Sequence, residues 1–408
     1  MRRLHVVAPW RFYEGSLRAL RSNVCTVYIF IMLRETQFDC AIVGAGIVGL
    51  AHALCARRAG FSVVVIDRDA VAAGASVRNF GFVTVTGQRE GATWRRARRS
   101  RDIWADVAAR AGITVVHRGL TVAARRPEAL ACLKEFVASP MGAGCRMLRQ
   151  SELPTPLRND LAGGLHSPHE LRVESRTAIA RLTAFLQAEG VTFLTSTAAH
   201  GVESGMVSTS AGTIRAEHIV ICPGADLVTL CSDVIKRREV GLTKLHMMRL
   251  AAPGWQLPSA VMSDLGLVRY LGYAGCPSLP ALRARLEAEQ ASHLASGVHL
   301  IAVQGEDGSL VVGDSHHRVA AADPFQPDEV DELILDELRL VLDLPTPRVV
   351  ERWVGFYPSS AVDAFIETPA PGVRLVMVTS GTGASTAFAI AEETLADLLG
   401  HPPPPHAV

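Results

Sequence analysis

Residues 38–67 constrain the fold of this chain more than any other stretch. Their order predicts a strand, a glycine-rich turn, a helix and a second strand, which together form a βαβ unit. Apolar residues fill both predicted strands, 38–43 and 62–66, and the predicted helix covers 47–59 and ends at Gly60. An acidic residue follows the second strand, so the unit has the parts of a dinucleotide-binding fold.

The turn of this unit carries glycines in G-x-G-x-x-G register. Gly44 permits the tight turn, Gly46 lets the backbone approach a pyrophosphate, and Gly49 allows the helix to pack closely on the strand. The helix N-terminus adds free N–H groups and the positive end of a dipole, and Asp67 can accept hydrogen bonds from ribose hydroxyls. The cofactor-binding residues predicted here are Gly44, Gly46, Ile47, Val48, Gly49, Asp67 and Arg68.

Length and composition disfavour several other classes of protein. The 408 residues suffice for two or three domains, and the net charge of +1 gives no global field that would favour nucleic acid or a membrane surface. No apolar run in the sequence is long enough to span a bilayer. The eight cysteines include no C-x-x-C pair, which favours buried thiols in a reducing cytoplasm over disulfides or a zinc site.

Residues 1–37 do not fit the rest of the chain. They are rich in arginine, with a short apolar run at 24–33. A signal peptide fits poorly, because this run comes late and no small-residue cleavage site precedes the first strand. We expect an over-extended start or a poorly packed extension, since Met32 lies shortly before the first strand.

The segment 74–88 is too rich in Gly, Ser and Asn for a plain helix, yet too apolar for a solvated loop. Gly74, Gly81 and Gly87 suggest backbone that lies close to a neighbouring group, although an ordinary loop stays an alternative. The residues that can serve a phosphate or a ring edge are Ser76, Arg78, Asn79 and Gly81.

Apolar residues at three- and four-residue spacing predict a helix over 91–111, with Trp94 and Trp104 on its inner face. Arg101 lies on that face, so we expect it to be partly buried and paired. Four more arginines fall outside the face and predict a solvated surface rather than a nucleic-acid site, because no aromatic platform accompanies them. They are Arg95, Arg96, Arg98 and Arg99.

The middle of the chain alternates between strand and helix patterns. We predict strands over 113–124, 191–195, 198–203, 206–210, 213–215 and 217–222, and helices over 127–138 and 176–189. Ser175 is the expected N-cap of the second helix. The last of these strands ends in a small-residue turn, where Pro223 and Gly224 are further candidates for cofactor contact.

Residues 236–350 change character, and we assign them to a substrate-binding half. Strand patterns at 244–250, 268–271, 299–304 and 310–314 predict an antiparallel sheet. Helices are predicted over 281–296 and 327–342, the second capped near Asp328.

A second strand–glycine–helix junction closes the chain. Strands predicted at 349–357 and 372–379 precede a glycine-rich turn and a helix that reaches Leu399. A helix N-terminus aimed at the pyrimidine ring of a flavin would stabilise the anionic reduced ring. The candidates at this junction are Gly381, Thr382, Gly383, Ala384 and Ser385.

The separation of the two glycine junctions favours FAD over NAD. A simple NAD domain shows a second βαβ half soon after the first, and here a long substrate half intervenes. An NAD-dependent dehydrogenase stays an alternative. We therefore predict an α/β (α+β) fold with a Rossmann-like FAD-binding domain of discontinuous segments and a substrate domain built on an antiparallel sheet. The predicted domains are an extension at 1–37, FAD-binding segments at 38–90, 165–235 and 348–400, substrate-binding segments at 91–164 and 236–347, and a tail at 401–408.

These motifs resemble the D-amino-acid oxidase superfamily of FAD enzymes, which includes glycine oxidase and sarcosine oxidase, over residues 38–398. The likeness is closer to a branch associated with bacterial phosphonate breakdown. It rests on the motifs GASVRNFG, SRDIW, SPHELRVE, CPGAD, KLHMMR, VRYLGYAGCPSL, VGDSHH and ERWVGFY. One departure is Gly383-Ala384-Ser385, where the branch usually has Gly-Met-Thr.

The resemblance implies oxidation of an amine related to 2-aminoethylphosphonate. Hydride would pass from the amine-bearing carbon to FAD, the imine would hydrolyse to an aldehyde, and oxygen would reoxidise the flavin. The same chemistry on glycine, sarcosine or a D-amino acid is the first alternative, and a flavoprotein without turnover is the second. We expect a cytoplasmic monomer or homodimer whose partners are a small amine and oxygen.

A phosphonate would need cations in the pocket. The cations in apolar strands are Lys244, Arg249, Arg269, His316 and Arg352, and Arg352 ranks first because Trp353 adjoins it and Tyr357 follows. Tyr270 and Tyr273 are possible pocket walls. The predicted catalytic set is Arg352, Tyr357, Lys244, Arg269, Tyr270 and His316. We expect no metal, because His316 and His317 have no third ligand nearby in the sequence.

Overall fold

The computed structural model describes residues 37–407, so the predictions for the first 36 residues lie outside the described part. Its helices are α2 (Ile47–Arg58), α3 (Ala92–Arg110), α4 (Pro127–Val137), α5 (Ser175–Ala188), α6 (Ser232–Arg237), α7 (Leu279–Glu289), α8 (Ala291–Ala295), α9 (Asp328–Val341) and α10 (Gly383–Leu398). Short 3-10 turns are η1 (Pro140–Gly142), η2 (Gln150–Glu152), η3 (Asp264–Val268) and η4 (Leu271–Tyr273). In these residues no helix has the length and apolar character that crossing a bilayer requires.

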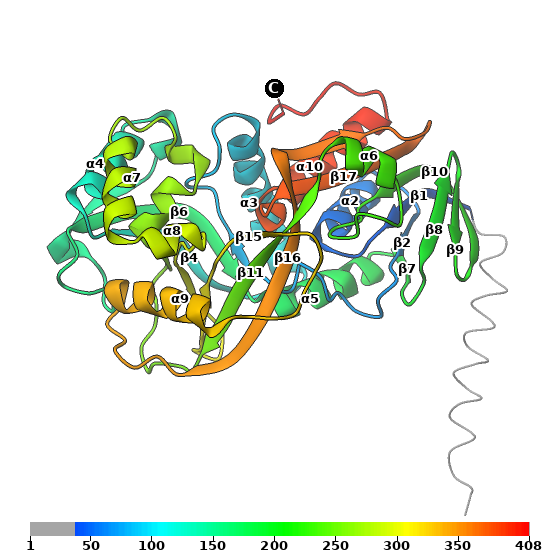
Figure 1. Ribbon diagram of the computed structural model, residues 1–408. Helices are drawn as coiled ribbons and strands as arrows, with labels where there is room; N and C mark the ends of the chain where they lie inside the picture. The colour runs from blue at the N-terminus through cyan, green and yellow to red at the C-terminus, as the bar shows by residue number, and fades with distance from the viewer. Residues whose placement is uncertain (1–36, 408) are drawn as a thin grey trace, which may run out of the picture.

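The strands run the whole length of the described chain (Figure 1). They are β1 (Gln37–Val43), β2 (Val63–Ile66), β3 (Phe82–Val83), β4 (Val115–Ala124), β5 (Arg146–Arg149), β6 (Gly163–Val173), β7 (Thr192–Leu194), β8 (Ala199–Glu203), β9 (Met206–Thr209), β10 (Gly212–Ile221), β11 (Gly241–Leu250), β12 (Ala260–Met262), β13 (Ile301–Gln304), β14 (Leu310–Gly313), β15 (His317–Val319), β16 (Val349–Glu367) and β17 (Val373–Ser380).

A parallel sheet in the order β17–β10–β1–β2–β7 carries the predicted βαβ unit at its centre. Alternate residues of its strands face opposite ways: Ile42 packs in one core with α2, α3, α5 and α10, whereas Ala41 packs in another with α6. Helices α2 and α10 lie side by side on the first face (Figure 1). Their N-termini therefore meet at the carboxyl ends of the central strands, where doubly wound sheets bind ligands.

The second half of the fold is an antiparallel sheet that continues from the first. The long strand β16 pairs with β17 at one end and with β11 along most of its length (Figure 1). From β11 the sheet continues through β14, β13 and β12. Helices α4, α7, α8 and α9 group around this half. This arrangement confirms the mixed α/β fold class.

Four local predictions were wrong or incomplete. The segment 268–271 is no strand, because it winds through η3 and η4 around Gly87, whose carbonyl accepts a hydrogen bond from Gly272 N–H. The helix predicted over 281–296 breaks at Gln290, whose side chain bonds Glu337. The strands predicted at 213–215 and 217–222 form the single strand β10, and those predicted within 113–124 form β4.

The N-cap of α5 also differs from the prediction. Glu174 occupies this position, and Ser175 is the first helical residue. The Ser175 hydroxyl instead donates to the Asn79 carbonyl at 3.0 Å, which ties the loop 74–88 to the helix. A tertiary contact has replaced the local cap. Helix α9 begins at Asp328 as expected, with Pro327 as its N-cap residue.

The arginines of α3 were predicted to be solvated, and two of them instead join α3 to α10. Arg96 makes a bidentate pair with Glu393, at 2.6 and 2.8 Å, and Arg99 pairs with Glu392 at 2.6 Å. The sequence could not indicate this, because the partners lie almost 300 residues away. Arg101 is partly buried and paired with Asp102, as expected. Helix α3 was predicted to belong to the substrate-binding half. In the structure it packs on α10 and shares a hydrophobic core with α2.

Substituting Arg96→Gln is expected to lower the free energy of unfolding by about 1–2 kcal/mol, because a half-buried bidentate pair is worth more than an exposed one. The measurement is urea unfolding of the FAD-loaded protein. Arg98→Gln is the matched control, since Arg98 is exposed and lies over the Trp94 ring instead of pairing with α10. Equal effects of the two substitutions would contradict the assignment.

Candidate active site

One elongated cavity of about 500 Å³ reaches from the tips of α2 and α10 into the antiparallel half. Gly46, Ile47 and Val48 line it from α2, and Gly381 to Ser385 line it from α10. An ideal Cβ on Gly383 would lie 3.7 Å from the Ile47 side chain, so the two helix tips adjoin. A single ligand in this cavity would meet the positive end of both helix dipoles.

Two of the three glycines of the first turn, Gly44 and Gly49, lie where their predicted roles require close packing. A Cβ on Gly49 would lie 1.8 Å from the Gly44 carbonyl oxygen, and a Cβ on Gly44, whose φ is +106°, would lie 2.3 Å from the Cys222 carbonyl oxygen. Both positions therefore exclude a side chain. Gly46 lines the cavity, and a Cβ there would lie 3.0 Å from the Ser76 hydroxyl oxygen; its contact with a pyrophosphate stays a prediction.

The loop 74–88 closes over the α2 tip. The Ser76 hydroxyl accepts a hydrogen bond from Ile47 N–H at 2.9 Å, and Ser76, Arg78 and Asn79 line the cavity. Asn79 also holds the loop in shape by accepting from Gly81 N–H at 2.6 Å. Gly74 was predicted to lie close to a neighbouring group, but a Cβ there would meet no protein atom within 4 Å.

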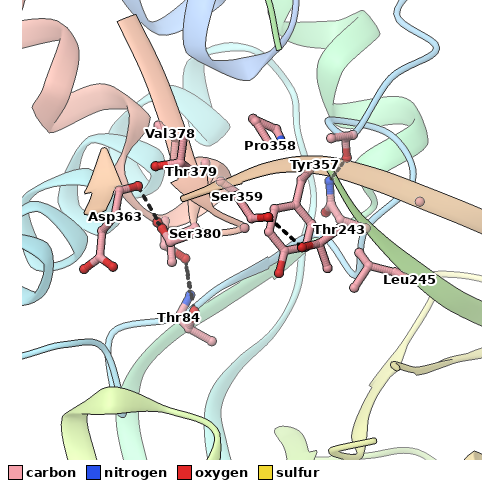
Figure 2. Close-up of a pocket in the computed structure, with 18 of the residues that line it drawn as sticks. Thr84, Thr243, Leu245, Tyr357, Pro358, Ser359, Asp363, Val378, Thr379 and Ser380 are labelled. Carbon is pink, nitrogen blue, oxygen red and sulfur yellow. Dashed lines mark hydrogen bonds between the residues drawn. The ribbon is translucent and has the colours of Figure 1, made fainter. Parts of the chain in front are cut away.

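The α10 junction is fixed by hydroxyl contacts. Ser380 Oγ donates to the Asp363 carbonyl at 3.0 Å, and Thr84 N–H donates to Ser385 Oγ at 2.9 Å (Figure 2). Trp104 Nε1 donates to the Ala384 carbonyl at 2.8 Å. These contacts hold the turn 380–385 rigidly, with the first N–H groups of α10 at the cavity.

Some predicted cofactor residues lie outside the cavity lining. Asp67 Oδ2 accepts from Ala45 N–H at 2.5 Å, so this carboxylate buttresses the glycine turn. Arg68 pairs with Asp226 at 2.8 Å and is largely exposed. Gly224 lines the cavity, whereas Gly44, Gly49, Gly81 and Pro223 do not. A ribose contact for Asp67 stays a prediction.

The other end of the cavity lies in the antiparallel half. Tyr357 of β16 stands next to the α10 turn, since a Cβ on Gly381 would lie 3.2 Å from its ring, and Figure 2 shows it beside the Thr243–Ser359 hydrogen bond. Arg269 Nη2 approaches the Tyr357 hydroxyl at 3.4 Å, and Tyr270 adjoins. In residues 37–407 no carboxylate forms an ion pair with Arg269 within 4.0 Å, so its charge is available to a ligand.

Three more polar side chains meet at this end of the cavity. Asp314 Oδ1 lies 3.3 Å from His299 Nε2, and Asp314 Oδ2 lies 3.9 Å from His316 Nε2. The rings of His299 and His316 are 4.8 Å apart, and Tyr270 and Tyr357 stand edge-on to them. The sequence analysis found no third partner for His316, and the structure supplies His299 and Asp314.

Burial controls the charge states in this cluster. It raises the pKa of Asp314 to about 8, although the Arg269 guanidinium opposes that shift. Burial, with Arg269 as a smaller cause, lowers the pKa of His299 to about 3, and it holds the pKa of His316 well below its usual range. Burial likewise raises the pKa of the Tyr357 hydroxyl. Both imidazoles are therefore neutral near pH 7, and Arg269 is the cation.

The structure does not bring two of the predicted catalytic residues to the cavity. Arg352, ranked first, is half exposed and pairs with Asp331 of α9 at 2.7 Å. Lys244 Nζ is bound by Asp323 at 2.6 Å and by the Phe325 carbonyl. Their positions in apolar strands were read correctly, but each side chain points to a carboxylate on another segment. Arg249 pairs with Glu174 and Glu351, and Tyr273 is buried against Phe136.

His299 and Asp314 were missed as site residues although a signal for them existed. Both are end residues of predicted strands, and the β13–β14 register pairs Ile301 with Gly313. Extending an antiparallel pairing by two residues places residue 299 opposite residue 315, between Asp314 and His316. Two neighbouring strands were predicted, but their pairing was not used.

Comparison with known proteins agrees with this geometry. The sequence profile of a family described as "FAD dependent oxidoreductase" matches residues 39–398. Searches of curated protein sequences give no significant match. Among solved structures, L-proline dehydrogenase from P. horikoshii has a TM-score of 0.74 at 15% identity and covers 91% of this chain and 96% of its own. Glycine oxidase from Geobacillus kaustophilus has a TM-score of 0.72 at 19% identity, with 90% and 95% covered.

A third similar structure is iminodiacetate oxidase from Chelativorans sp. BNC1, with a TM-score of 0.67 at 18% identity and 89% and 96% covered. At these identities the likeness shows the fold. The profile match spans most of the chain, and the cavity fits the cofactor it implies, because Gly46, Gly381 and Gly383 line it together with the N-termini of α2 and α10. The chain belongs to the family of FAD-dependent oxidoreductases, and FAD is its cofactor.

Proposed function

We propose that this enzyme oxidises the C–N bond of a small amine that carries an anionic group, and that the substrate is an aminophosphonate related to 2-aminoethylphosphonate. The observation that carries the proposal is Arg269, a cavity-lining guanidinium without a carboxylate partner in the described residues. Arg269 is exposed to this cavity and has no carboxylate partner in the part of the chain that the structure describes, so it can bind an anion there, and a substrate phosphonate or carboxylate would provide one.

A second guanidinium favours the phosphonate over a carboxylate. Arg318 of β15 also lines the cavity, and its strand lies beside β11, where Thr243 pairs with it in register. A phosphonate dianion gains more from two cations than a carboxylate does. The motif likeness to the branch associated with phosphonate breakdown supports the same substrate class.

Bound FAD would accept hydride from the amine-bearing carbon. The residues of this chain would hold the substrate for that transfer: Arg269 binds the anion, Tyr357 and Tyr270 form walls, and the two helix tips hold the cofactor. Oxygen as the acceptor and a cytoplasmic location belong to the proposal. The seven cysteines of the described residues are free thiols, which fits a reducing compartment.

An amino-acid substrate is the second candidate. The similar structures include proteins named glycine oxidase and iminodiacetate oxidase, and a carboxylate can pair with Arg269 alone. Oxidation of glycine, sarcosine or a D-amino acid would use the same cavity and the same cofactor.

A substrate panel tests the proposal. The panel holds 2-aminoethylphosphonate, its N-methyl derivative, glycine, sarcosine and D-alanine, read by peroxide release and by anaerobic bleaching of the flavin. We expect the aminophosphonates to give the highest kcat/KM. If an amine bleaches the flavin but no peroxide is released, that amine is still a substrate and oxygen is excluded as the electron acceptor. If no amine bleaches the flavin, the protein is a flavoprotein without turnover.

The substitution Arg318→Gln separates the two substrate classes. It is expected to raise KM for an aminophosphonate about tenfold to a hundredfold, because a charge-assisted contact is lost, and to leave KM for sarcosine or glycine nearly unchanged. Turnover of sarcosine or glycine alone, insensitive to this substitution, would overturn the phosphonate assignment and support the amino-acid alternative.

A further inference from the structure

The cluster of His299, Asp314 and His316 is buried at the end of the cavity that lies in the antiparallel half, and the proposed function gives these side chains no role. The side chains are 4%, 7% and 14% exposed, and all three line the cavity. Neither Asp314 Oδ1 nor His299 Nδ1 has a hydrogen-bond partner in the described residues. Buried polar atoms are rarely left unpaired, and a proton taken up by Asp314 would give its Oδ1 a partner in His299 Nε2, 3.3 Å away.

The tautomer of His316 places a second lone pair beside the Asp314 carboxyl. Its Nδ1 lies 3.3 Å from the Gly297 carbonyl, which can only accept, so Nδ1 carries the proton. Nε2 of the neutral ring is then a bare lone pair, and it faces the Asp314 carboxyl oxygen at 3.9 Å. Two lone pairs facing each other are stabilised when a proton or a cation lies between or beside them.

We propose that Asp314, held between His299 and His316, is the base that accepts the proton of the substrate ammonium group. In this step an N–H bond of the ammonium breaks and an O–H bond forms on Asp314. The electron pair stays on nitrogen and then forms the C=N bond as hydride leaves the adjacent carbon for the cofactor. The inference rests on the proposed amine substrate but not on the phosphonate.

The arrangement around Asp314 complements a substrate with an ammonium group at one end and an anion at the other. Arg269 is close enough to influence Asp314, His299 and His316 electrostatically. The anion can therefore pair with Arg269 while the ammonium reaches Asp314. The titratable and charged groups around the carboxyl are His299 before β13, His316 after β14, Arg269 and Tyr270 at η3 and η4, and Tyr357 of β16, with His317 beyond His316.

The strength of the base suits this task. An alkylammonium has a pKa of about 10, so transfer to an ordinary aspartate of pKa about 4 is disfavoured by about six powers of ten. Burial raises the pKa of Asp314 to about 8, which reduces that factor to about two powers of ten. The neutral carboxylic acid that results is also the form that the buried site favours.

A divalent cation is the competing occupant, because one ligand atom from each of the three residues lies within 4.8 Å of the others. The Arg269 guanidinium repels a metal cation at this place. A proton that binds Asp314 neutralises its carboxylate and adds no fixed ion to the cluster. We therefore favour the proton and make the metal an outcome of the test.

The test compares the pH dependence of kcat/KM in the FAD-loaded wild type and in Asp314→Asn. The substrate is the amine of highest kcat/KM from the panel, whether phosphonate or amino acid. In the wild type, kcat/KM is expected to rise with pH and level off above about 8, because Asp314 must be ionised to accept the proton. In Asp314→Asn, kcat/KM should be about a hundredfold lower than in the wild type at pH 7.5, and its pH profile should lack the break near 8. It should rise towards the wild-type value only as the pH approaches the pKa of the amine itself. Asp314→Glu should restore part of the rate and the break.

A second measurement does not depend on turnover. It uses 2-aminoisobutyrate and (2-amino-2-methylpropyl)phosphonate, which have no hydrogen on the amine-bearing carbon, and follows their binding by the change in flavin absorbance. Affinity in the wild type should show the same break near pH 8, and Asp314→Asn should lose it. Asp307→Asn, a substitution of an exposed carboxylate bound to Ser309, should keep the wild-type profile.

Three results would overturn the proposal. A uniform loss of rate at every pH in Asp314→Asn would show a structural role. Unchanged breaks in both measurements would place the base elsewhere. Loss of wild-type activity with a chelator, with recovery on adding one divalent metal, would assign the cluster to a cation. If no amine of the panel reacts, the proposed function fails, and the two binding probes still test Asp314.

Discussion

Replacing Arg269 with glutamine is expected to lower kcat/KM about 100- to 1,000-fold while the bound FAD is retained. The guanidinium lines the substrate end of the cavity, and no carboxylate within 4.0 Å pairs with it in residues 37–407. Arg269 is exposed to the cavity, and bound substrate and FAD would shield its pair with the substrate anion from water; losing one partner of such a shielded pair costs about 3–4 kcal/mol, which corresponds to this factor. The loss should lie mainly in KM, and steady-state kinetics together with the flavin absorption spectrum measure it.

Arg352→Gln is the matched control for this experiment. The sequence ranked Arg352 above Arg269, but its side chain is half exposed and pairs with Asp331 of α9. We expect its KM to stay within about twofold of the wild type, with a stability loss below about 1 kcal/mol, as for other exposed ion pairs. A large rise in KM for Arg352→Gln, with little change for Arg269→Gln, would restore the sequence-based ranking and contradict the site described above.

The substitution Gly49→Val is expected to produce a protein without bound FAD whose free energy of unfolding is lower by about 3–5 kcal/mol. A Cβ at this position would lie 1.8 Å from the Gly44 carbonyl oxygen, so α2 must move away from β1. That movement displaces the helix N-terminus from the cavity. The ratio of flavin to protein absorbance and thermal unfolding with added FAD measure both effects.

Gly74→Ala provides the comparison at a glycine that has space. A Cβ on Gly74 would meet nothing within 4 Å, although the position belongs to the loop that closes over the α2 tip. We expect full FAD content and a change in stability below about 0.5 kcal/mol. Normal FAD binding in Gly49→Val would show that the close approach of helix and strand is not needed for the cofactor.

The sequence alone determined the parts of the site that depend on local structure. The βαβ unit over 38–67 and the strand–glycine–helix junction near residue 381 were both predicted, and β1, α2, β2, β17 and α10 confirm them. Their convergence on one cavity followed from the cofactor they implied. Such features are readable because a glycine turn, a buried strand and an amphipathic helix are each set by residues a few positions apart.

Only the tertiary structure decided which charged side chains are free to act. Lys244, Arg269 and Arg352 look alike in sequence, since each lies among apolar residues. Their difference comes from Asp323 and Asp331 on distant segments, which pair with Lys244 and Arg352 and leave Arg269 to the cavity. In the same way, the pairing of β13 with β14 places His299 beside Asp314. Spacing along a chain fixes the face on which a side chain lies, but the partner it meets there depends on elements that only folding brings together.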